Sequence, residues 1–173
     1  MNPGTNASID ISMRDITGLI AGLRDPVISK RQAAARELGR SDNPAATEPL
    51  GIALSDSHPK VRSECVQALG RLGGPAASPF LIRALNDTEP DVRTAAIAAV
   101  GKICDHQAVN SLISCLKDPD YQVRIGAAEV LGKLGDPKAI GPLDALARDP
   151  FFDVRDTAET AIGRIRKKRM RCP

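Results

Sequence analysis

Apolar residues along this chain recur at the spacing of amphipathic helices. In the clearest stretch, which starts at Tyr121, they follow the i, i+3/i+4, i+7 spacing, at Val123, Ala127, Val130, Leu131 and Leu134. A second run follows from about Pro137 to Ala147, with Ala139, Ile140, Leu143 and Leu146. Such spacing puts the apolar side chains on one face of a helix. Gly135-Asp136-Pro137 separates the runs with a helix C-cap, an N-cap and a first-turn proline. The pattern predicts a helix–turn–helix pair.

The same pattern returns every 31 residues. Three unrelated residue types keep this step without slippage: Arg31, Arg62, Arg93, Arg124 and Arg155; Asp25, Asp56, Asp87, Asp118 and Asp149; Gly39, Gly70, Gly101, Gly132 and Gly163. Self-similarity at a period between about 20 and 50 residues is the signature of a solenoid. The sequence therefore predicts an all-α solenoid, in which each repeat packs mainly on its neighbours.

The register divides the chain into four helix pairs with one capping helix at each end. We expect a flexible segment over 1–14, a capping helix over 15–24, repeats over 25–163 and a basic tail over 164–173. The repeats would span 25–55, 56–86, 87–117, 118–148 and, as a half repeat, 149–163. Glu159 stands where earlier repeats have Ala35, Val66, Ile97 and Ala128. A charge suits that position only where no further layer covers it, so we expect the array to end there.

Composition narrows the class of protein. The chain has 173 residues and is 42% hydrophobic, but it contains only three Phe, one Tyr and no Trp. No apolar run approaches the roughly 20 residues that span a bilayer, and no secretory signal precedes the repeats. Four cysteines without CxxC pairs or regular spacing indicate neither a zinc site nor a disulfide framework. We expect a cytoplasmic monomer with reduced cysteines.

The unit D-P-x-x-x-V-R-x-x-A-A-x-x-L-G-x-x-G-D-P, taken from residues 118–137, resembles the HEAT-like repeat of the phycobilisome lyase type. The resemblance covers roughly residues 16–166. It implies a right-handed, armadillo-like superhelix whose second helices line a concave face. The family includes bilin lyase subunits, deoxyhypusine hydroxylase and many scaffolds, so the fold alone does not give the function.

We interpret the Asp and Arg columns as a stacking device. Arginine in a first helix can hold a carboxylate of an adjoining turn by charge-assisted hydrogen bonds. A catalytic site is local, whereas a stacking contact is periodic, so the regular spacing favours a structural ladder. Its predicted members are Asp56, Arg62, Asp87, Arg93, Asp118, Arg124, Asp149 and Arg155.

The chain lacks the residues of a metalloenzyme. The resemblance to deoxyhypusine hydroxylase would require repeated His-Glu pairs for two irons, but Pro59 follows His58 and Gln107 follows His106. Nor do Ser, Cys and His form an arrangement that suggests nucleophilic catalysis. We expect no catalytic residue, no metal and no cofactor.

The second helices diverge at positions that face away from the predicted core. Variation on one face of a stiff scaffold is typical of a partner-binding surface. The predicted contact residues are Glu48, Ile52, Ser55, Arg83, Asn86, Asn110, Ser114, Lys117, Ala145 and Arg148. Phe151, in an exposed column, is a candidate interface anchor, whereas we expect Phe152 to pack between layers.

The sequence thus predicts a non-catalytic scaffold that binds another protein through its concave face. Two alternatives stay open. One is an accessory subunit of a bilin or other cofactor lyase, against which the few aromatic residues count. The other is an adaptor that uses the basic residues of 164–173 to reach nucleic acid or an anionic membrane surface.

Overall fold

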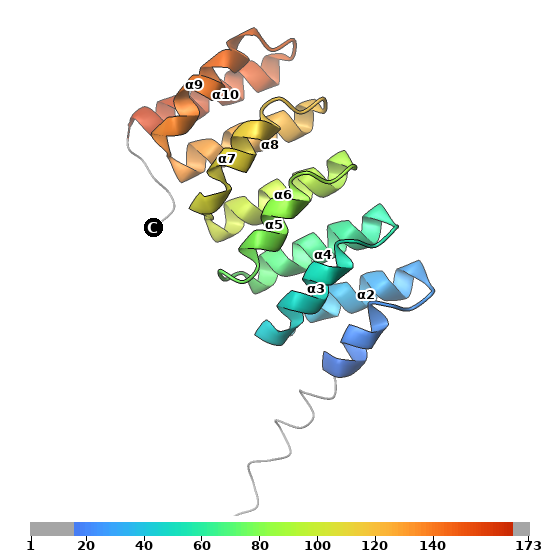
Figure 1. Ribbon diagram of the computed structural model, residues 1–173. Coiled ribbons are helices and arrows are strands. Elements are labelled where there is room, and N and C mark those ends of the chain that lie inside the picture. The colour runs from blue at the N-terminus through green and yellow to red at the C-terminus, as the bar shows by residue number, and fades with distance from the viewer. Residues whose placement is uncertain (1–15, 168–173) are drawn as a thin grey trace, which may run out of the picture.

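The computed structural model describes residues 16–167, which form a stack of short helices (Figure 1). Residues 16–22 are helical. They are followed by α2 (Ile28–Leu38), η1 (Pro44–Ala46), α3 (Thr47–Ala53), α4 (Pro59–Leu72), α5 (Ser78–Ala84), α6 (Pro90–Ile103), η2 (His106–Ala108), α7 (Val109–Cys115), α8 (Tyr121–Leu134), η3 (Pro137–Ala139), α9 (Ile140–Asp144), η4 (Ala145–Arg148) and α10 (Phe152–Arg166).

The helices lie in two layers. The first helices of the repeats, α2, α4, α6, α8 and α10, stack side by side, and the second helices, α3, α5, α7 and α9, lie in front of them in Figure 1. This arrangement confirms the all-α solenoid of four helix pairs with one further helix at each end. The predicted segment 1–14, Asp15 and residues 168–173 lie outside the described part. The boundary predicted after Gly163 falls inside α10, which continues to Arg166.

The turns within the helix pairs follow from their residues. At the end of α8, Gly135 adopts the left-handed conformation with φ of 74°, which glycine reaches without a steric penalty. Asp136 then accepts a hydrogen bond of 2.9 Å from the backbone N–H of Lys138, and Pro137 takes the first position of η3. These contacts satisfy the free backbone donors at the start of the second helix.

The glycine column allows the first helices to approach closely. A Cβ atom on Gly132 would lie 2.8 Å from the backbone of Ala161 in the next first helix. Gly39, Gly70 and Gly101 meet their neighbouring helix in the same way, at Ala68, Ala99 and Val130. Each contact joins residues 29 positions apart, so it fixes how one layer sits on the next.

An arginine–aspartate ladder runs along the turns. Arg31 binds Asp56, Arg62 binds Asp87, Arg93 binds Asp118 and Arg124 binds Asp149, each through Nε and Nη2, with N···O distances of 2.6–3.0 Å. The third nitrogen of each arginine donates back to its own repeat; Arg93 Nη1, for example, lies 2.8 Å from the carbonyl oxygen of Asp87. One side chain therefore connects two consecutive inter-repeat turns.

The aspartates of the ladder also shape the backbone. Asp118 Oδ1 accepts from the backbone N–H of Asp120 at 2.9 Å, and Asp149 Oδ1 accepts from that of Phe151 at 3.0 Å. The side chains of the four aspartates that an arginine holds are only 6–11% exposed. Bidentate pairs with so little solvent contact are worth more than surface ion pairs.

The ladder lowers the pKa of three carboxyl groups, those of Asp56, Asp87 and Asp149. Burial by itself would raise the pKa of Asp56, Asp87 and Asp149, but the hydrogen bonds from the arginines and from the following backbone N–H groups outweigh it. The net result is a pKa below the ordinary carboxyl value of 3.8. The folded state therefore favours the ionised form of these groups.

Removal of one rung should destabilise the stack far more than removal of a surface pair. Arg93→Met removes the two guanidinium hydrogen bonds from the nearly buried carboxylate of Asp118, and we expect the free energy of unfolding to fall by about 3 kcal/mol. Arg40→Met, which breaks the exposed pair between Arg40 and Glu37, should change it by less than about 0.5 kcal/mol. Urea denaturation measures both; equal effects would contradict a stabilising ladder.

Acid should loosen the solenoid. Because the folded-state pKa of Asp56, Asp87 and Asp149 lies below the unfolded value, their stabilisation is present above the unfolded pKa and is lost as pH falls through the folded-state pKa. We expect the melting temperature to drop steeply below about pH 4. In Arg62→Met, Asp87 loses the hydrogen bonds from Arg62 that lower its pKa most. This variant should therefore lose less stability on acidification than the parent protein.

Candidate protein-binding surface

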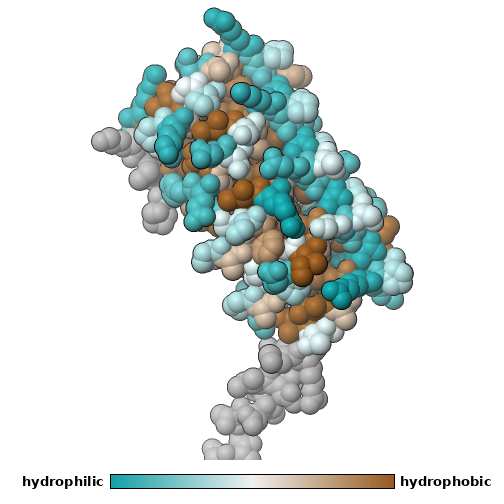
Figure 2. Space-filling view, in the orientation of Figure 1, coloured by the Kyte–Doolittle hydropathy of each residue, from teal (hydrophilic) through white to brown (hydrophobic). Residues whose placement is uncertain are grey.

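The side chains predicted to contact a partner share one exposed surface, which we call the second-helix face. They lie on, or directly after, the second helix of each repeat, and all are exposed. The surface consists of Glu48, Ile52 and Ser55 at α3, Arg83 and Asn86 at α5, Asn110, Ser114 and Lys117 at α7, and Ala145 and Arg148 at η4. Figure 2, which views this side, shows apolar patches interspersed with hydrophilic side chains along the stack.

A cluster around Arg83 orders part of the second-helix face. Arg83 Nη2 donates a hydrogen bond of 2.6 Å to the carbonyl oxygen of Gly51 in the preceding second helix. Its guanidinium lies 5.8 Å from the ring centre of Phe80, within the range of a cation–π contact. Beside Gly51, the side chain of Ile52 is 57% exposed. A fixed arginine thus lies next to an unusually exposed aliphatic side chain.

The sequence did not identify Gly51 and Phe80 as members of this cluster. A Cβ atom on Gly51 would overlap the Phe80 ring, so glycine is required there for the ring to pack across the layers. A signal was available, because Gly51 lies in a column that holds isoleucine at Ile20, Ile82 and Ile113. A glycine in an apolar column indicates close approach of a neighbouring group.

The structure gathers only some of the predicted residues. Ser55, Arg83 and Asn86 line one shallow cleft of about 370 Å³, together with the ladder residues Arg62 and Asp87. The predicted residues on α7 and η4 line neither this cleft nor the larger one beside α10, and they lie on the open surface. The second-helix face is therefore a broad, shallow surface, typical of protein contacts more than of small-molecule pockets.

Both phenylalanines at the start of α10 are exposed, as expected for Phe151 but not for Phe152. The ring of Phe151 stacks on that of Tyr121, with centroids 4.6 Å apart and planes at 9°, and it also lies 5.7 Å from the guanidinium of Arg124. Phe152, which we expected to pack between layers, is 67% exposed. That expectation is wrong, because the layer offset brings Phe151, and not Phe152, onto the preceding tyrosine. Phe151 is 46% exposed and anchored within the stack.

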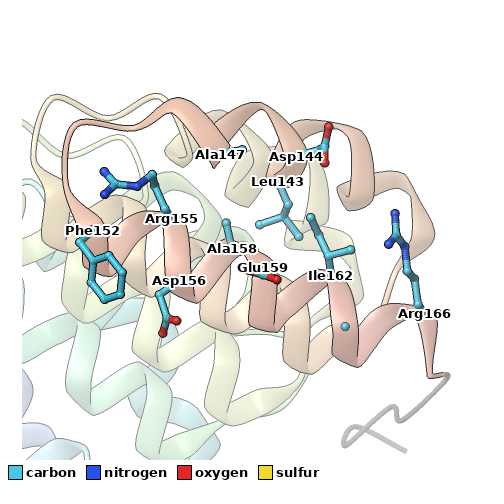
Figure 3. Close-up of a pocket in the computed structure, with 11 residues that line it drawn as sticks. Leu143, Asp144, Ala147, Phe152, Arg155, Asp156, Ala158, Glu159, Ile162 and Arg166 are labelled. Carbon is cyan, nitrogen blue, oxygen red and sulfur yellow. The ribbon is translucent and has the colours of Figure 1, made fainter.

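A larger cleft lies at the C-terminal end of the array (Figure 3). Its volume is about 630 Å³. It is bounded by α9 and η4 on one side and by α10 on the other, and its lining includes Leu143, Phe152, Arg155, Glu159, Ile162 and Arg166. Glu159 is exposed there.

Residues 16–167 contain no group of three or more His, Cys, Asp or Glu side chains arranged to hold a metal ion.

Burial raises the pKa of the thiol of Cys65 to about 12 and that of Cys115 to about 11, which makes both poor nucleophiles at neutral pH. His58 acts as an N-cap, since its Nδ1 accepts from the backbone N–H of Lys60 at 3.2 Å. Every helix in this part of the chain is too short or too polar to cross a bilayer.

The repeat, the ladder and the two-layer stack define an α-solenoid, and comparison of the sequence identifies its family. The family model of HEAT repeats matches residues 16–101 and 78–163. The chain belongs to the HEAT-repeat family. No curated protein sequence matches the chain.

Solved structures agree with this assignment. The complex of CpcE and CpcF of phycocyanin lyase from Nostoc sp. PCC7120 contains a chain that is 27% identical, with a TM-score of 0.75 over 88% of the present chain. The match covers 65% of that lyase chain, so the present chain spans less than two thirds of its length. This similarity agrees with a HEAT-like repeat of the phycobilisome lyase type.

Two more distant structures show the fold alone. A chain of the Schizosaccharomyces pombe condensin Cnd3–Cnd2 subcomplex is 22% identical, with a TM-score of 0.72, and the match covers 91% of the present chain and 23% of that one. A designed armadillo repeat protein in complex with the peptide (KR)4 is 17% identical, with a TM-score of 0.65 and coverage of 94% and 87%. All three structures are complexes with a protein or a peptide.

Proposed function

We propose that this protein is a non-catalytic scaffold that binds a partner protein through the second-helix face. The proposal rests on one observation: some positions of the repeat keep their residue type, and others vary. The ladder and the core keep their residue types from repeat to repeat, whereas the exposed positions of α3, α5, α7 and η4 differ in charge or size between most repeats. A stiff stack that displays different side chains in each layer can recognise an extended sequence of contacts.

The Arg83 cluster supplies the best candidate for the energetic centre of this surface. Arginine and large apolar side chains dominate binding energies when they are held in place before the partner arrives. Arg83 is held by Gly51 and Phe80, so little side-chain freedom remains to be lost on binding. Ile52 next to it offers exposed apolar area.

Charge suggests the chemistry of the partner. Arg83, Lys117 and Arg148 place one basic side chain on each of three successive repeats, while Glu48 lies at the N-terminal end of the surface. A partner segment with acidic side chains at matching intervals and an apolar residue opposite Ile52 would complement this pattern.

An accessory role in a cofactor lyase is the second candidate, and the similarity to the phycocyanin lyase complex favours it. The clefts described above are shallow and partly charged, which suits a tetrapyrrole poorly. A shift of the visible absorbance of a linear tetrapyrrole on addition of the purified protein would support this role. The adaptor role of the basic tail involves Arg164, Arg166 and Lys167; residues 168–173 lie outside the described part.

Affinity capture from the native cell with charge-reversed variants tests the proposed surface. Lys117→Glu combined with Arg148→Glu should weaken capture of the partner by about tenfold or more, and Ile52→Asp should do the same through loss of apolar contact. Quantitative mass spectrometry of the captured proteins measures both effects.

Matched controls lie on the first helices. Lys60→Glu and Lys102→Glu make the same charge change at exposed positions of α4 and α6, and they should leave capture unchanged. If the captured proteins stay the same in the second-helix variants, or disappear equally in the controls, the second-helix face is not the binding surface.

A further inference from the structure

At each end of the described array, one residue of the ladder lacks its arginine or aspartate partner. Arg155 donates through Nη1 to the carbonyl oxygens of Asp149 and Pro150, as the other ladder arginines do in their own repeats. Within residues 16–167, however, no carboxylate lies within ion-pair distance of its Nε and Nη2. Every other arginine of the column uses these two nitrogens to hold the aspartate of the next repeat.

At the opposite end, Asp25 is an aspartate without a ladder arginine. Its Oδ1 accepts from the backbone N–H of Val27 at 2.8 Å, so the turn has the same form as in the later repeats. Its ion-pair partner in the described part is Lys30, at 3.5 Å, and 24% of its side chain is exposed. The carboxylate is thus positioned like those of Asp56 to Asp149, but it is more open to solvent.

The terminal helices are complementary halves of one repeat. Residues 16–22 occupy the columns of a second helix but have no described first helix before them, and α10 is a first helix with no described second helix after it. Leu19 shares a column with Leu50, Leu81, Leu112 and Leu143, which are fully buried, yet Leu19 is partly exposed. The cleft beside α10 lies where the second helix of that repeat would pack (Figure 3).

Exposed side chains at the two ends also match in register. In the internal stack, Tyr121 contacts Phe151 of the next repeat. The equivalent contact beyond α10 would join Phe152, which is 67% exposed, to a residue in the position of Val27, which is 46% exposed. Residues of facing first helices in the stack are 29 positions apart. If a further repeat followed α10, this offset would place the exposed Asp156 opposite the residue that corresponds to Lys30, which is also exposed.

We propose that copies of this protein associate head to tail, with residues 16–22 of one copy in the cleft beside α10 of another. In this arrangement Arg155 binds Asp25 of the next copy, Phe152 packs on its Val27 and Asp156 pairs with its Lys30. All three contacts follow from the single register that the internal repeats define. The contact joins two different surfaces, so it can add further copies instead of closing into a dimer.

The association should be weaker than the internal stacking. The C-terminal end carries Asp144 and Glu159 at positions where the repeats inside the array have mainly apolar or small residues, and Gly163 would face Glu37 where Gly132 faces Ala161. Polar groups at these positions reduce the apolar area that a junction buries. We therefore expect reversible association that depends on concentration, in contrast to the monomer expected from the sequence. The contact borders η4 but does not use the residues of the second-helix face, since neither Ala145 nor Arg148 lines the cleft, so it is distinct from the proposed function.

Sedimentation velocity of the full-length protein over a concentration series tests the proposal. The weight-average sedimentation coefficient should rise with concentration, and the rise should diminish at high salt because the pairs are screened. Asp156→Lys and Lys30→Asp should each weaken self-association about three- to tenfold, since each puts like charges opposite one another. The double variant, and an equimolar mixture of the two single variants, should restore it.

Controls separate the contact from general charge effects. Asp153→Lys and Lys60→Asp make the same changes at exposed positions that lie outside the proposed contact, and they should associate like the parent protein. Arg155→Gln tests the contact with Asp25 directly and should weaken association; since it also removes the hydrogen bonds to the carbonyl oxygens of Asp149 and Pro150, its thermal unfolding is measured alongside. A parent protein that stays monomeric at all concentrations would overturn the proposal, as would a dimer that does not grow or an association that the charge exchange leaves unaffected.

Discussion

The bidentate contact between an arginine and the aspartate of the next repeat is the constraint on which the stack depends. Its geometry admits only one distance and one orientation between consecutive turns, and its near-complete removal from solvent makes a misplaced layer costly. The glycine column adds a second constraint, because Gly70 and Gly132 bring neighbouring first helices to backbone contact. Together these contacts leave one relation between each layer and the next.

A scaffold fixed in this way is free to vary elsewhere. Since the ladder and the apolar columns hold the layers, the exposed residues of the second helices can change without loss of the fold. The same regularity has a consequence at the ends, where the contacts of the repeat have no partner within the described chain. Arg155 and Asp25 show this most directly: each has the conformation of its internal equivalents and lacks the group that those equivalents bind.

The candidate surface was predictable as far as exposure follows from the helical period. Residues such as Ile52, Lys117 and Arg148 are exposed because their columns point away from the core, and a column can be identified in the sequence. The hydrogen bond from Arg83 to Gly51 could not be predicted in this way, because it joins two second helices across a layer. The packing expected for Phe152 was wrong for the same reason, because the offset between layers brings Phe151 onto Tyr121 and leaves Phe152 exposed.

The sequence by itself determined the fold class, the number of helix pairs and the two columns that form the ladder, because each depends on a local period of 31 residues that is repeated along the chain. The tertiary structure alone decided which residue of one layer meets which residue of the next. That offset is 25 positions for the ladder and 29 for the glycine contacts. It results from side-chain packing between helices, which no periodicity within a single helix can specify.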